Sequence, residues 1–299
     1  MRVRRSATEV VVDAPAKLNL FFEVLRKRPD GYHEIETLMC PIDIYDTLRV
    51  RDNADASIRF ECRCVGGAAD CGLDQVPGGP ENLVVRAIEL VRRQARVHRG
   101  ADVSLVKRIP AAAGLGGGSS DAAAAIVAVN EVWGLGRSRD ELADWAAQLG
   151  SDIPFFLVDG PAVCRGRGER ISPIRGMPGL SFVVVRPPDG LATPDVYRAC
   201  RPAPAPVSVG QAVERFACGD PALAGRCLWN GLQAAAERLS PWVKRLEERF
   251  AQLDCLGHAM SGSGTSYFGL CRHARHARRS ARRLRAMGLG AVFAARGCR

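Results

Sequence analysis

The stretch Pro110-Ala-Ala-Ala-Gly-Leu-Gly-Gly-Gly-Ser-Ser-Asp-Ala-Ala-Ala-Ala125 decides the fold prediction, because its glycines stand between a strand pattern and a helix pattern. On the strand side, Val103, Leu105 and Ile109 fall at odd spacings with polar or charged neighbours, which is typical of a half-buried strand. On the helix side, an alanine-rich run continues to about Gly134. The segment therefore predicts a strand, a tight loop and a helix in succession.

The loop has the chemistry of a phosphate cradle. Glycine lets several backbone N–H groups point at one anion, and the N-terminus of a helix adds about half a positive charge behind them. Ser119, Ser120 and Asp121 offer side-chain oxygens that we expect to cap the helix. A flexible surface loop is the ordinary alternative, but the helix pattern that follows without a break favours a cradle.

Two other phosphate-binding motifs are excluded. A Walker A loop requires Gly-Lys-Ser/Thr, and the sequence contains no Gly-Lys pair. A dinucleotide fingerprint requires a third glycine where Ser119 stands. It also follows the early first strand of a βαβ unit, and no such strand precedes this loop.

Composition bounds the class of protein. The 299 residues are enough for a large core in two lobes, and 47% hydrophobic with 25% charged residues is ordinary for a globular protein. The N-terminus lacks the apolar run of a signal peptide, and no later segment is long enough to span a membrane. The odd number of cysteines, 11, favours reduced thiols. We therefore expect a cytoplasmic protein without a membrane partner.

The net charge of +10 is concentrated near the C-terminus, where seven arginines fall within residues 272–285. Interspersed alanines favour a helix that covers a sheet and exposes a basic face. A surface for phosphate backbones is the alternative, although no RNA-binding aromatic signature accompanies the arginines. We expect no specific nucleic-acid partner.

An early strand is predicted at Ala14–Leu25, where alternation sends Lys17, Asn19 and Phe21 to one side. From spacing alone, we expect Lys17 and Asn19 to lie on the solvated face of an edge strand. The turn residues of Arg28–His33 follow, and a second strand is expected from Glu34 to Met39.

A second glycine-rich loop, Met260–Ser266, precedes a strand pattern at Tyr267–Leu270. A tight turn between two strands explains it equally well from local sequence.

Four segments, in this order along the chain, resemble the GHMP small-molecule kinase superfamily. They are Ala16–Leu20, Lys27–Glu34, Gly114–Ser120 and Met260–Gly264. The likeness runs from about Val12 to Phe268, and the segments 41–48, 81–87 and 151–156 share it. The Lys27–Glu34 turn is similar to that of the branch that phosphorylates a cytidine-diphosphate-linked methylerythritol.

The resemblance implies an α+β fold with two lobes and an active site in the cleft between them. Residues 1–160 would form an ATP-binding lobe, and residues 161–299 a lobe that contributes to substrate binding. Asp152 would accept the proton of the attacking hydroxyl, and Lys17 would orient both. From sequence alone, Asp152 serves equally well as a cap at a helix that begins near Pro154.

The resemblance also implies ATP as co-substrate, with Mg²⁺, because phosphoryl transfer needs a phosphate cradle and charge neutralisation. Ser119 or Ser120 would lend a hydroxyl to phosphate or to Mg²⁺, but no residue is assigned as a metal ligand. Asn82, Leu83 and Lys107 would lie near the adenine; their ordinary roles are a helix cap, a core contact and a solvated charge. The residues implied to bind ATP are Pro110, Gly114, Leu115, Gly116, Gly117, Gly118, Ser119, Ser120, Asn82, Leu83 and Lys107.

Substrate binding is implied for a set of polar, aromatic and glycine residues. The set is Asn19, Tyr32, His33, Tyr197, Gly262 and Ser263. Without the resemblance, His33 is a surface histidine and Tyr197 a packing aromatic. A kinase for another small alcohol and a noncatalytic nucleotide-binding relative remain the alternatives. The substrate is expected to be the only specific partner of a monomer or homodimer.

One segment departs from the family pattern. Cys62, Cys64 and Cys71 precede Gly78-Gly-Pro80 in a stretch that looks longer than in relatives. The absence of a second CxxC or a paired histidine nearby disfavours zinc, and a variable loop is expected.

Overall fold

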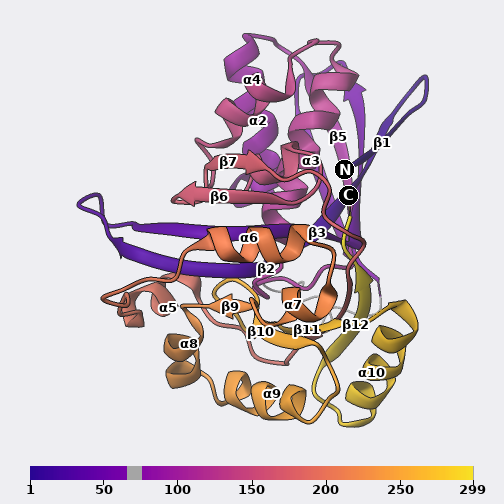
Figure 1. The fold of residues 1–299 in the computed structure, drawn as a ribbon. Coiled ribbons are helices and arrows are strands. Elements are labelled where there is room, and N and C mark those ends of the chain that lie inside the picture. Colours follow the sequence, from indigo (N-terminus) through magenta and orange to yellow (C-terminus); the bar gives the residue numbers. More distant parts are fainter. Residues whose placement is uncertain (66–75, 299) are drawn as a thin grey trace. The chain divides into compact units, whose positions relative to one another are not determined.

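The computed structural model describes residues 1–65 and 76–298 (Figure 1). The chain forms two compact units, and each unit is built from several chain segments. Unit 1 consists of Met1–Ala16, Ile44–Ala111 and Gly116–Asp159, and unit 2 of Lys17–Asp43, Ala112–Leu115 and Gly160–Arg299. One unit boundary falls after Asp159, but Lys17–Asp43 and Ala112–Leu115 belong to unit 2, so the two units do not follow a single division of the chain near residue 160. The assignment of ATP binding to residues 1–160 and of substrate binding to residues 161–299 stays a prediction.

Unit 1 combines strands with a pair of packed helices. The strands β2 (Val10–Lys27) and β3 (His33–Asn53) contribute residues to both units. The other elements of unit 1 are β1 (Arg2–Arg5), β4 (Ile58–Cys64), η2 (Gly79–Glu81), α2 (Leu83–Ala95), β5 (Gly100–Lys107), α3 (Gly117–Val132), α4 (Arg139–Ala146) and η3 (Pro154–Leu157). In this unit β1 pairs antiparallel with β2, β5 pairs antiparallel with β3, and β4 pairs parallel with β5. α2 packs against α3.

The predicted succession of strand, loop and helix is confirmed. β5 buries Val103 and Leu105 but ends at Lys107, so Ile109 lies beyond the strand. The helix α3 ends just before Gly134, whose φ of 64° is the left-handed conformation that glycine adopts readily.

The start of α3 differs from the prediction. The helix begins at Gly117, and Gly116 is its N-cap with φ 72° and no side-chain cap. The prediction that Ser119, Ser120 and Asp121 cap the helix is therefore wrong, because all three lie inside it. Two glycines turn the chain into the helix without help from a side-chain oxygen.

Unit 2 contains a four-stranded antiparallel sheet in the order β10-β11-β8-β12. Its strands are β8 (Ser181–Arg186), β10 (Gly257–Met260), β11 (Tyr267–Cys271) and β12 (Ala291–Arg296). Its helices are α5 (Thr193–Ala199), α6 (Val209–Ala217), α7 (Pro221–Gly225), α8 (Gln233–Leu239), α9 (Pro241–Ala251) and α10 (Ala274–Ala286). The hairpin β6 (Ala162–Gly166) and β7 (Arg170–Pro173) adds to β3, and the short β9 (Trp229–Asn230) pairs with β2.

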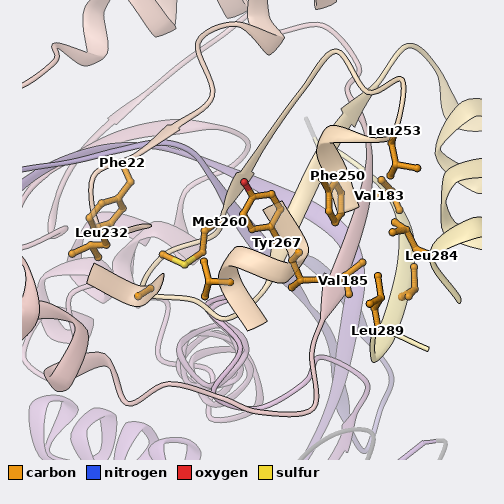
Figure 2. Close-up of a cluster of buried hydrophobic side chains, with 14 of the residues drawn as sticks. Phe22, Val183, Val185, Leu232, Phe250, Leu253, Met260, Tyr267, Leu284 and Leu289 are labelled. Atoms are coloured by element: carbon orange, nitrogen blue, oxygen red, sulfur yellow. The ribbon is translucent and has the colours of Figure 1, made fainter. Parts of the chain in front are cut away.

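The main core of unit 2 lies between this sheet and the helices α9 and α10. Val183, Val185, Tyr267 and Phe250 belong to one buried cluster, which Figure 2 shows. Leu246 belongs to the same cluster. The alternation of β8 sends both valines to the same face. Burial of this apolar area is the dominant stabilising term for the unit.

The basic C-terminal segment forms α10, as predicted. The helix buries Ala277, Ala281 and Leu284 against β8, β11 and β12, and its arginines lie on the opposite face. Within residues 1–65 and 76–298, every helix falls short of the length and apolarity that a bilayer span requires.

Candidate active site

Lys17 is a buried cation of unit 2. Its residue is 3% exposed, and its Nζ donates to Oδ1 of Asn19 at 2.5 Å and to the carbonyl oxygen of Gly114 at 3.0 Å. The interpretation of Lys17 and Asn19 as the solvated face of an edge strand is wrong, because both residues are buried. The ammonium instead joins β2 to the beginning of the first glycine loop.

Asn19 is held by its own chain of hydrogen bonds. Its Nδ2 donates to Oγ1 of Thr37 at 2.8 Å, and that hydroxyl donates to the carbonyl oxygen of Phe21 at 2.7 Å. Because the amide nitrogen is committed to Thr37, the amide oxygen faces Lys17. The position of the Lys17 ammonium is therefore fixed through buried neighbours.

The second glycine loop packs against Lys17 and Gly114. Oγ of Ser261 donates to the carbonyl oxygen of Gly114 at 3.0 Å. A Cβ on Gly262, whose φ is 58°, would lie 3.2 Å from both Nζ of Lys17 and the carbonyl oxygen of Gly114. Only glycine fits this approach, and the two glycine loops are neighbours within unit 2. Ser263 meets Thr193 at the start of α5, with 2.8 Å between their hydroxyl oxygens.

Asn230 holds the second loop from β9. Its Nδ2 donates to the carbonyl oxygens of Met260 at 2.7 Å and Gly262 at 2.9 Å, and its Oδ1 accepts from the backbone N–H of Leu232 at 2.9 Å. Sequence reasoning missed this residue, because an asparagine before a glycine is an ordinary turn signal.

The first glycine loop carries its helix start in unit 1. Gly116 is the N-cap of α3, and as a glycine it offers no side chain to cap the first backbone N–H groups of the helix. Gly117 is buried, whereas Gly118 is exposed and Ser119 half-buried. Oγ of Ser120 is buried and has no hydrogen-bond partner among the described residues. This arrangement suits an anion at the helix N-terminus.

The remaining loop residues that were assigned to ATP lie before the helix. Pro110 is buried in unit 1, and Leu115 is buried in unit 2. The carbonyl oxygen of Leu115 accepts the backbone N–H of Lys17 at 2.9 Å. The loop is thus anchored to β2 through backbone as well as side chain.

Lys107 lies beneath the first turn of α3, between two carboxylates. Its Nζ forms ion pairs with Asp46 and, at 2.7 Å, with Asp121. Burial raises the pKa of Asp121 to about 8; Lys107 opposes this shift and Asp46 adds to it. Lys107 is 2% exposed, so its interpretation as a solvated charge is wrong. Its contact with adenine stays a prediction.

Asp46 anchors this buried triad to the backbone. Its Oδ1 accepts the N–H groups of Arg108 at 2.5 Å and Ile109 at 2.9 Å. A Cβ on Gly117 would lie 3.2 Å from Nζ of Lys107, which places the ammonium directly behind the glycine loop. Sequence reasoning assigned no role to Asp46, because alternation along β3 does not reveal a buried carboxylate.

Asp152 lies in unit 1, in the turn before the 3₁₀ helix η3. The N-cap of η3 is Ile153, so Asp152 does not occupy the N-cap position that the sequence allowed. The helix-cap interpretation of Asp152 is therefore wrong. Because Lys17 belongs to unit 2, joint action of the two side chains stays a prediction.

Asn82 performs the structural role that its position allowed. Its Oδ1 accepts the N–H of Val84 at 2.8 Å and caps α2, while its Nδ2 donates to the carbonyl oxygen of Pro77 at 2.7 Å. Leu83 lies 3.6 Å from where a Cβ on Gly118 would stand. Contact of either residue with adenine stays a prediction.

The turn after β2 presents aromatic side chains in unit 2. Tyr32 is 54% exposed, and the guanidinium carbon of Arg167 lies 4.9 Å from its ring centroid. The rings of His33 and Tyr197 lie 5.1 Å apart with a tilt of 31°. Burial, and to a lesser extent Lys27, lowers the pKa of His33, which leaves a neutral imidazole at neutral pH.

The structure describes two of the three cysteines in the segment that departs from the family pattern. Cys62 and Cys64 lie on β4, and Cys71 lies outside the described residues. Among residues 1–65 and 76–298, no group of three or more His, Cys, Asp and Glu side chains has a metal-holding arrangement.

Comparisons with known proteins agree with this geometry. Residues 82–160 match the GHMP kinases N terminal domain, and residues 209–289 match the GHMP kinases C terminal domain. A 4-diphosphocytidyl-2-C-methyl-D-erythritol kinase of Pelotomaculum thermopropionicum is 44% identical over 274 residues, which cover 91% of this chain and 92% of that protein. A protein with the same name from a Nocardioides species is 39% identical and covers 95% of this chain and 96% of its own.

Solved structures give the same result. The crystal structure of a 4-(cytidine 5'-diphospho)-2C-methyl-D-erythritol kinase superposes with a TM-score of 0.79 at 38% identity, over 96% of this chain and 99% of that chain. A homoserine kinase from Cytophaga hutchinsonii, at 18% identity, shares the fold with a TM-score of 0.73 over 98% of this chain and 96% of its own.

The α+β fold and these matches define a small-molecule kinase, an enzyme that transfers a phosphoryl group to an alcohol. The chain matches both the N-terminal and the C-terminal domain model of one family. The chain belongs to the GHMP kinase family.

Proposed function

We propose that the protein transfers the γ-phosphate of ATP to the 2-hydroxyl of 4-diphosphocytidyl-2-C-methyl-D-erythritol, in the non-mevalonate route to isoprenoid precursors. The observation that carries the proposal is the 44% identity, over 91% of the chain, to a relative named for this reaction. The paired rings of His33 and Tyr197 support it, because cytosine offers a flat face and a donor–acceptor edge.

The ATP phosphates would be bound by the loop from Gly114 to Ser120. The N-terminus of α3 supplies backbone donors and a partial positive charge without a competing side-chain cap. Adenine would lie near Asn82, Leu83 and Lys107.

Mg²⁺ fits the donor atoms at this helix start. Oγ of Ser120 and Oδ1 of Asp121 are buried oxygens without a hydrogen-bond partner among the described residues, and Mg²⁺ prefers oxygen ligands. We propose that the Ser120 hydroxyl serves the metal or a phosphate. When bound, the ion would neutralise charge on the transferring phosphoryl group.

Asp152 and Lys17 would act on the acceptor hydroxyl. The carboxylate would accept the proton of the attacking oxygen, and the buried ammonium would orient that oxygen and stabilise the developing charge. The support for Lys17 is its fixed position between Asn19 and the carbonyl oxygen of Gly114. The support for Asp152 is its place within residues 82–160, which match the N-terminal domain of the family.

The substrate side would use Asn19, Tyr32, His33, Tyr197, Gly262 and Ser263. Neutral His33 is able to donate one hydrogen bond and accept another, which suits the edge of a base. We further propose a cytoplasmic enzyme that works as a monomer or homodimer and has no specific nucleic-acid partner.

The test is ADP release from ATP with a panel of alcohols, namely the cytidine substrate, mevalonate and homoserine. We expect turnover with the cytidine substrate alone. Preference for mevalonate or homoserine would assign another GHMP kinase activity, and ATP binding without turnover would indicate a noncatalytic relative.

Asp152→Asn should lower kcat by roughly 10²-fold or more, because the variant cannot accept the proton. Asp144→Asn, at an exposed position of α4, is the matched control and should retain full kcat. Steady-state kinetics measure both, with the thermal unfolding midpoint as the check on the fold. Near-normal turnover by Asp152→Asn would refute the proposed base.

A further inference from the structure

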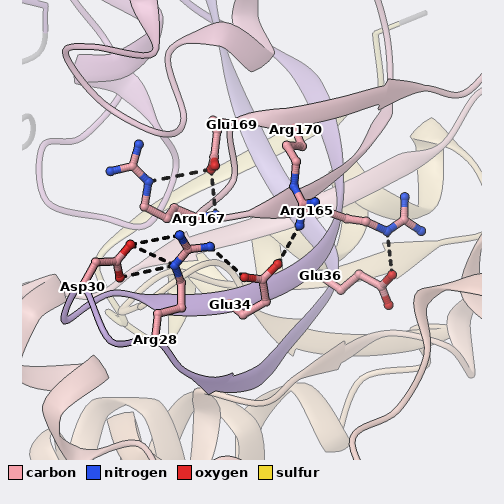
Figure 3. A network of polar contacts seen from close by, with 8 residues as sticks. All are labelled: Arg28, Asp30, Glu34, Glu36, Arg165, Arg167, Glu169 and Arg170. Atoms are coloured by element: carbon pink, nitrogen blue, oxygen red, sulfur yellow. Dashed lines mark hydrogen bonds and ion pairs between the residues drawn. The ribbon is translucent and has the colours of Figure 1, made fainter.

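The turn that presents Tyr32 and His33 is closed by ion pairs between its two ends. Nη1 of Arg28, before the turn, lies 2.8 Å from Oε2 of Glu34, after the turn (Figure 3). Arg28 also pairs with Asp30 at 2.9 Å, and Oδ1 of Asp30 accepts the N–H of Tyr32 at 3.1 Å. The backbone N–H of Arg28 donates to the carbonyl oxygen of Tyr32 at 2.8 Å. These contacts restrict the backbone on both sides of the aromatic residues.

A second element holds the same turn. Oε1 of Glu34 accepts from Nη2 of Arg170 on β7 at 2.6 Å, so one carboxylate pairs with two guanidinium groups (Figure 3). The tip of the β6–β7 hairpin also reaches the turn, because Arg167 lies over the ring of Tyr32. Glu169 fixes that tip by accepting the N–H of Arg167 at 2.7 Å.

The burial of Glu34 makes this arrangement effective. Its side chain is 13% exposed and that of Arg28 is 31% exposed, so this ion pair is screened less than a pair at the surface, whereas Arg170 is 65% exposed. Asp30, by contrast, is exposed. The hydrogen bond from Arg28 lowers the pKa of its carboxyl. Glu34 is therefore the member of the network on which the turn depends most.

We propose that Glu34 is a positioning residue for nucleobase recognition, which holds the Tyr32–His33 turn through Arg28 and Arg170. The inference rests on the proposed function, because it needs a cytidine group to be recognised. The ordered turn binds a base without losing further backbone freedom, and a loosened turn loses that freedom on binding. Glu34 touches no reacting atom, so its effect falls on substrate affinity and not on the chemical step.

Strand β3 offers a matched control in Glu36. It lies two residues after Glu34, its side chain is 15% exposed, and it pairs with Arg165 on β6 at 2.8 Å. Its Oε2 also accepts the N–H of Val209 at 3.1 Å. Both glutamates thus join β3 to the same hairpin, but only Glu34 also pairs with Arg28 in the turn. Glu34→Gln and Glu36→Gln keep side-chain shape and remove one negative charge each.

The experiment measures binding of cytidine 5′-diphosphate by calorimetry, together with kcat and both KM values. For Glu34→Gln we expect the Kd of the nucleotide and the KM of the cytidine substrate to rise on the order of fivefold, which is the scale of two partly buried ion pairs. The KM of ATP and kcat should stay within about twofold of wild type on the same scale, and the unfolding midpoint should stay close to that of wild type. Glu36→Gln should keep the wild-type Kd of the nucleotide, both KM values and kcat. Arg28→Gln removes the cation of the turn that pairs with Glu34, and it should raise the Kd and the KM of the cytidine substrate as Glu34→Gln does.

Three results would overturn the inference. Wild-type affinity in both Glu34→Gln and Arg28→Gln would show that the network does not position the turn. Equal losses in Glu34→Gln and Glu36→Gln would assign the effect to the hairpin as a whole. Failure of the wild-type protein to bind the nucleotide or to phosphorylate the cytidine substrate would remove the proposed function and this inference together.

Discussion

The two glycine loops use the same residue type for different physical tasks. The second loop lies between β10 and β11, and its carbonyl oxygens are fixed by Asn230. The first loop leads into α3, where glycine provides a left-handed N-cap and uncapped backbone N–H groups. Glycine in the second loop permits close approach, whereas glycine at the start of α3 permits display of donors.

Gly114 permits the close approach at the point where the two loops meet. Its φ is 71°, and a Cβ there would overlap the carbonyl oxygen of Ser261. Gly118, the second residue of α3, would place a Cβ at an ordinary 3.6 Å from Leu83. The comparison therefore predicts a steep gradient in substitution effects within a single loop.

Lys17→Ala should give the largest effect, because this ammonium contacts Gly114 and lies beside Gly262. We expect kcat to fall by roughly 10²-fold or more, since transition-state stabilisation is lost. Lys244→Ala, at an exposed position of α9, should be neutral. Steady-state kinetics measure both. A Lys17→Ala protein that folds and keeps normal kcat would deny that the loops meet at a catalytic cation.

Gly114→Ala should follow. The positive φ and the overlap with Ser261 should cost about 3 kcal/mol of unfolding free energy. Separation of the loops should also lower kcat about tenfold, because misplacement of catalytic groups is costly. Urea unfolding and initial rates provide the two measurements. If Gly114→Ala is as stable as wild type, the second loop moves at no cost to accommodate the added Cβ.

Asn230→Asp should destabilise the second loop alone. The substitution turns an amide donor into an acceptor that faces the carbonyl oxygens of Met260 and Gly262. Loss of these buried hydrogen bonds should lower the free energy of unfolding by about 2 kcal/mol. The KM of the acceptor substrate should rise more than that of ATP. A rise confined to ATP would reverse the roles that we assign to the loops.

Gly118→Ala should have the smallest effect. The position is in the first turn of α3, and Ala is favoured over Gly in helices by up to about 1 kcal/mol. We expect unchanged or slightly higher stability and a KM for ATP within about threefold of wild type on the same reasoning. Damage equal to that of Gly114→Ala would erase the gradient on which the comparison depends.

Sequence patterns predicted local structure better than the environment of each side chain. The order of strand, loop and helix around Gly114 and the basic helix α10 followed from periodicity and composition. The N-cap of α3 was mispredicted, because serine and aspartate are strong capping residues and a glycine N-cap has no side-chain signal. Capping preference also favoured the wrong interpretation of Asp152.

The sequence did not reveal which charged residues are buried. Alternation along β2 placed Lys17 and Asn19 on one face but could not show that Thr37 and Gly114 cover it. Lys107 is separated from Asp46 by 61 residues, so their ion pair arises only from the fold. The aromatic pair of His33 and Tyr197 was found through family likeness, because no local pattern links the two residues.

The most direct test of the account is product analysis after incubation with ATP, Mg²⁺ and the cytidine substrate. We predict one ADP for each new phosphate monoester, with the new phosphate on the tertiary alcohol, and we expect Asp152→Asn to form this product roughly 10²-fold more slowly than the wild-type protein. ADP formed without a phosphorylated cytidine product, or product formed by Asp152→Asn at the wild-type rate, would contradict the central claim.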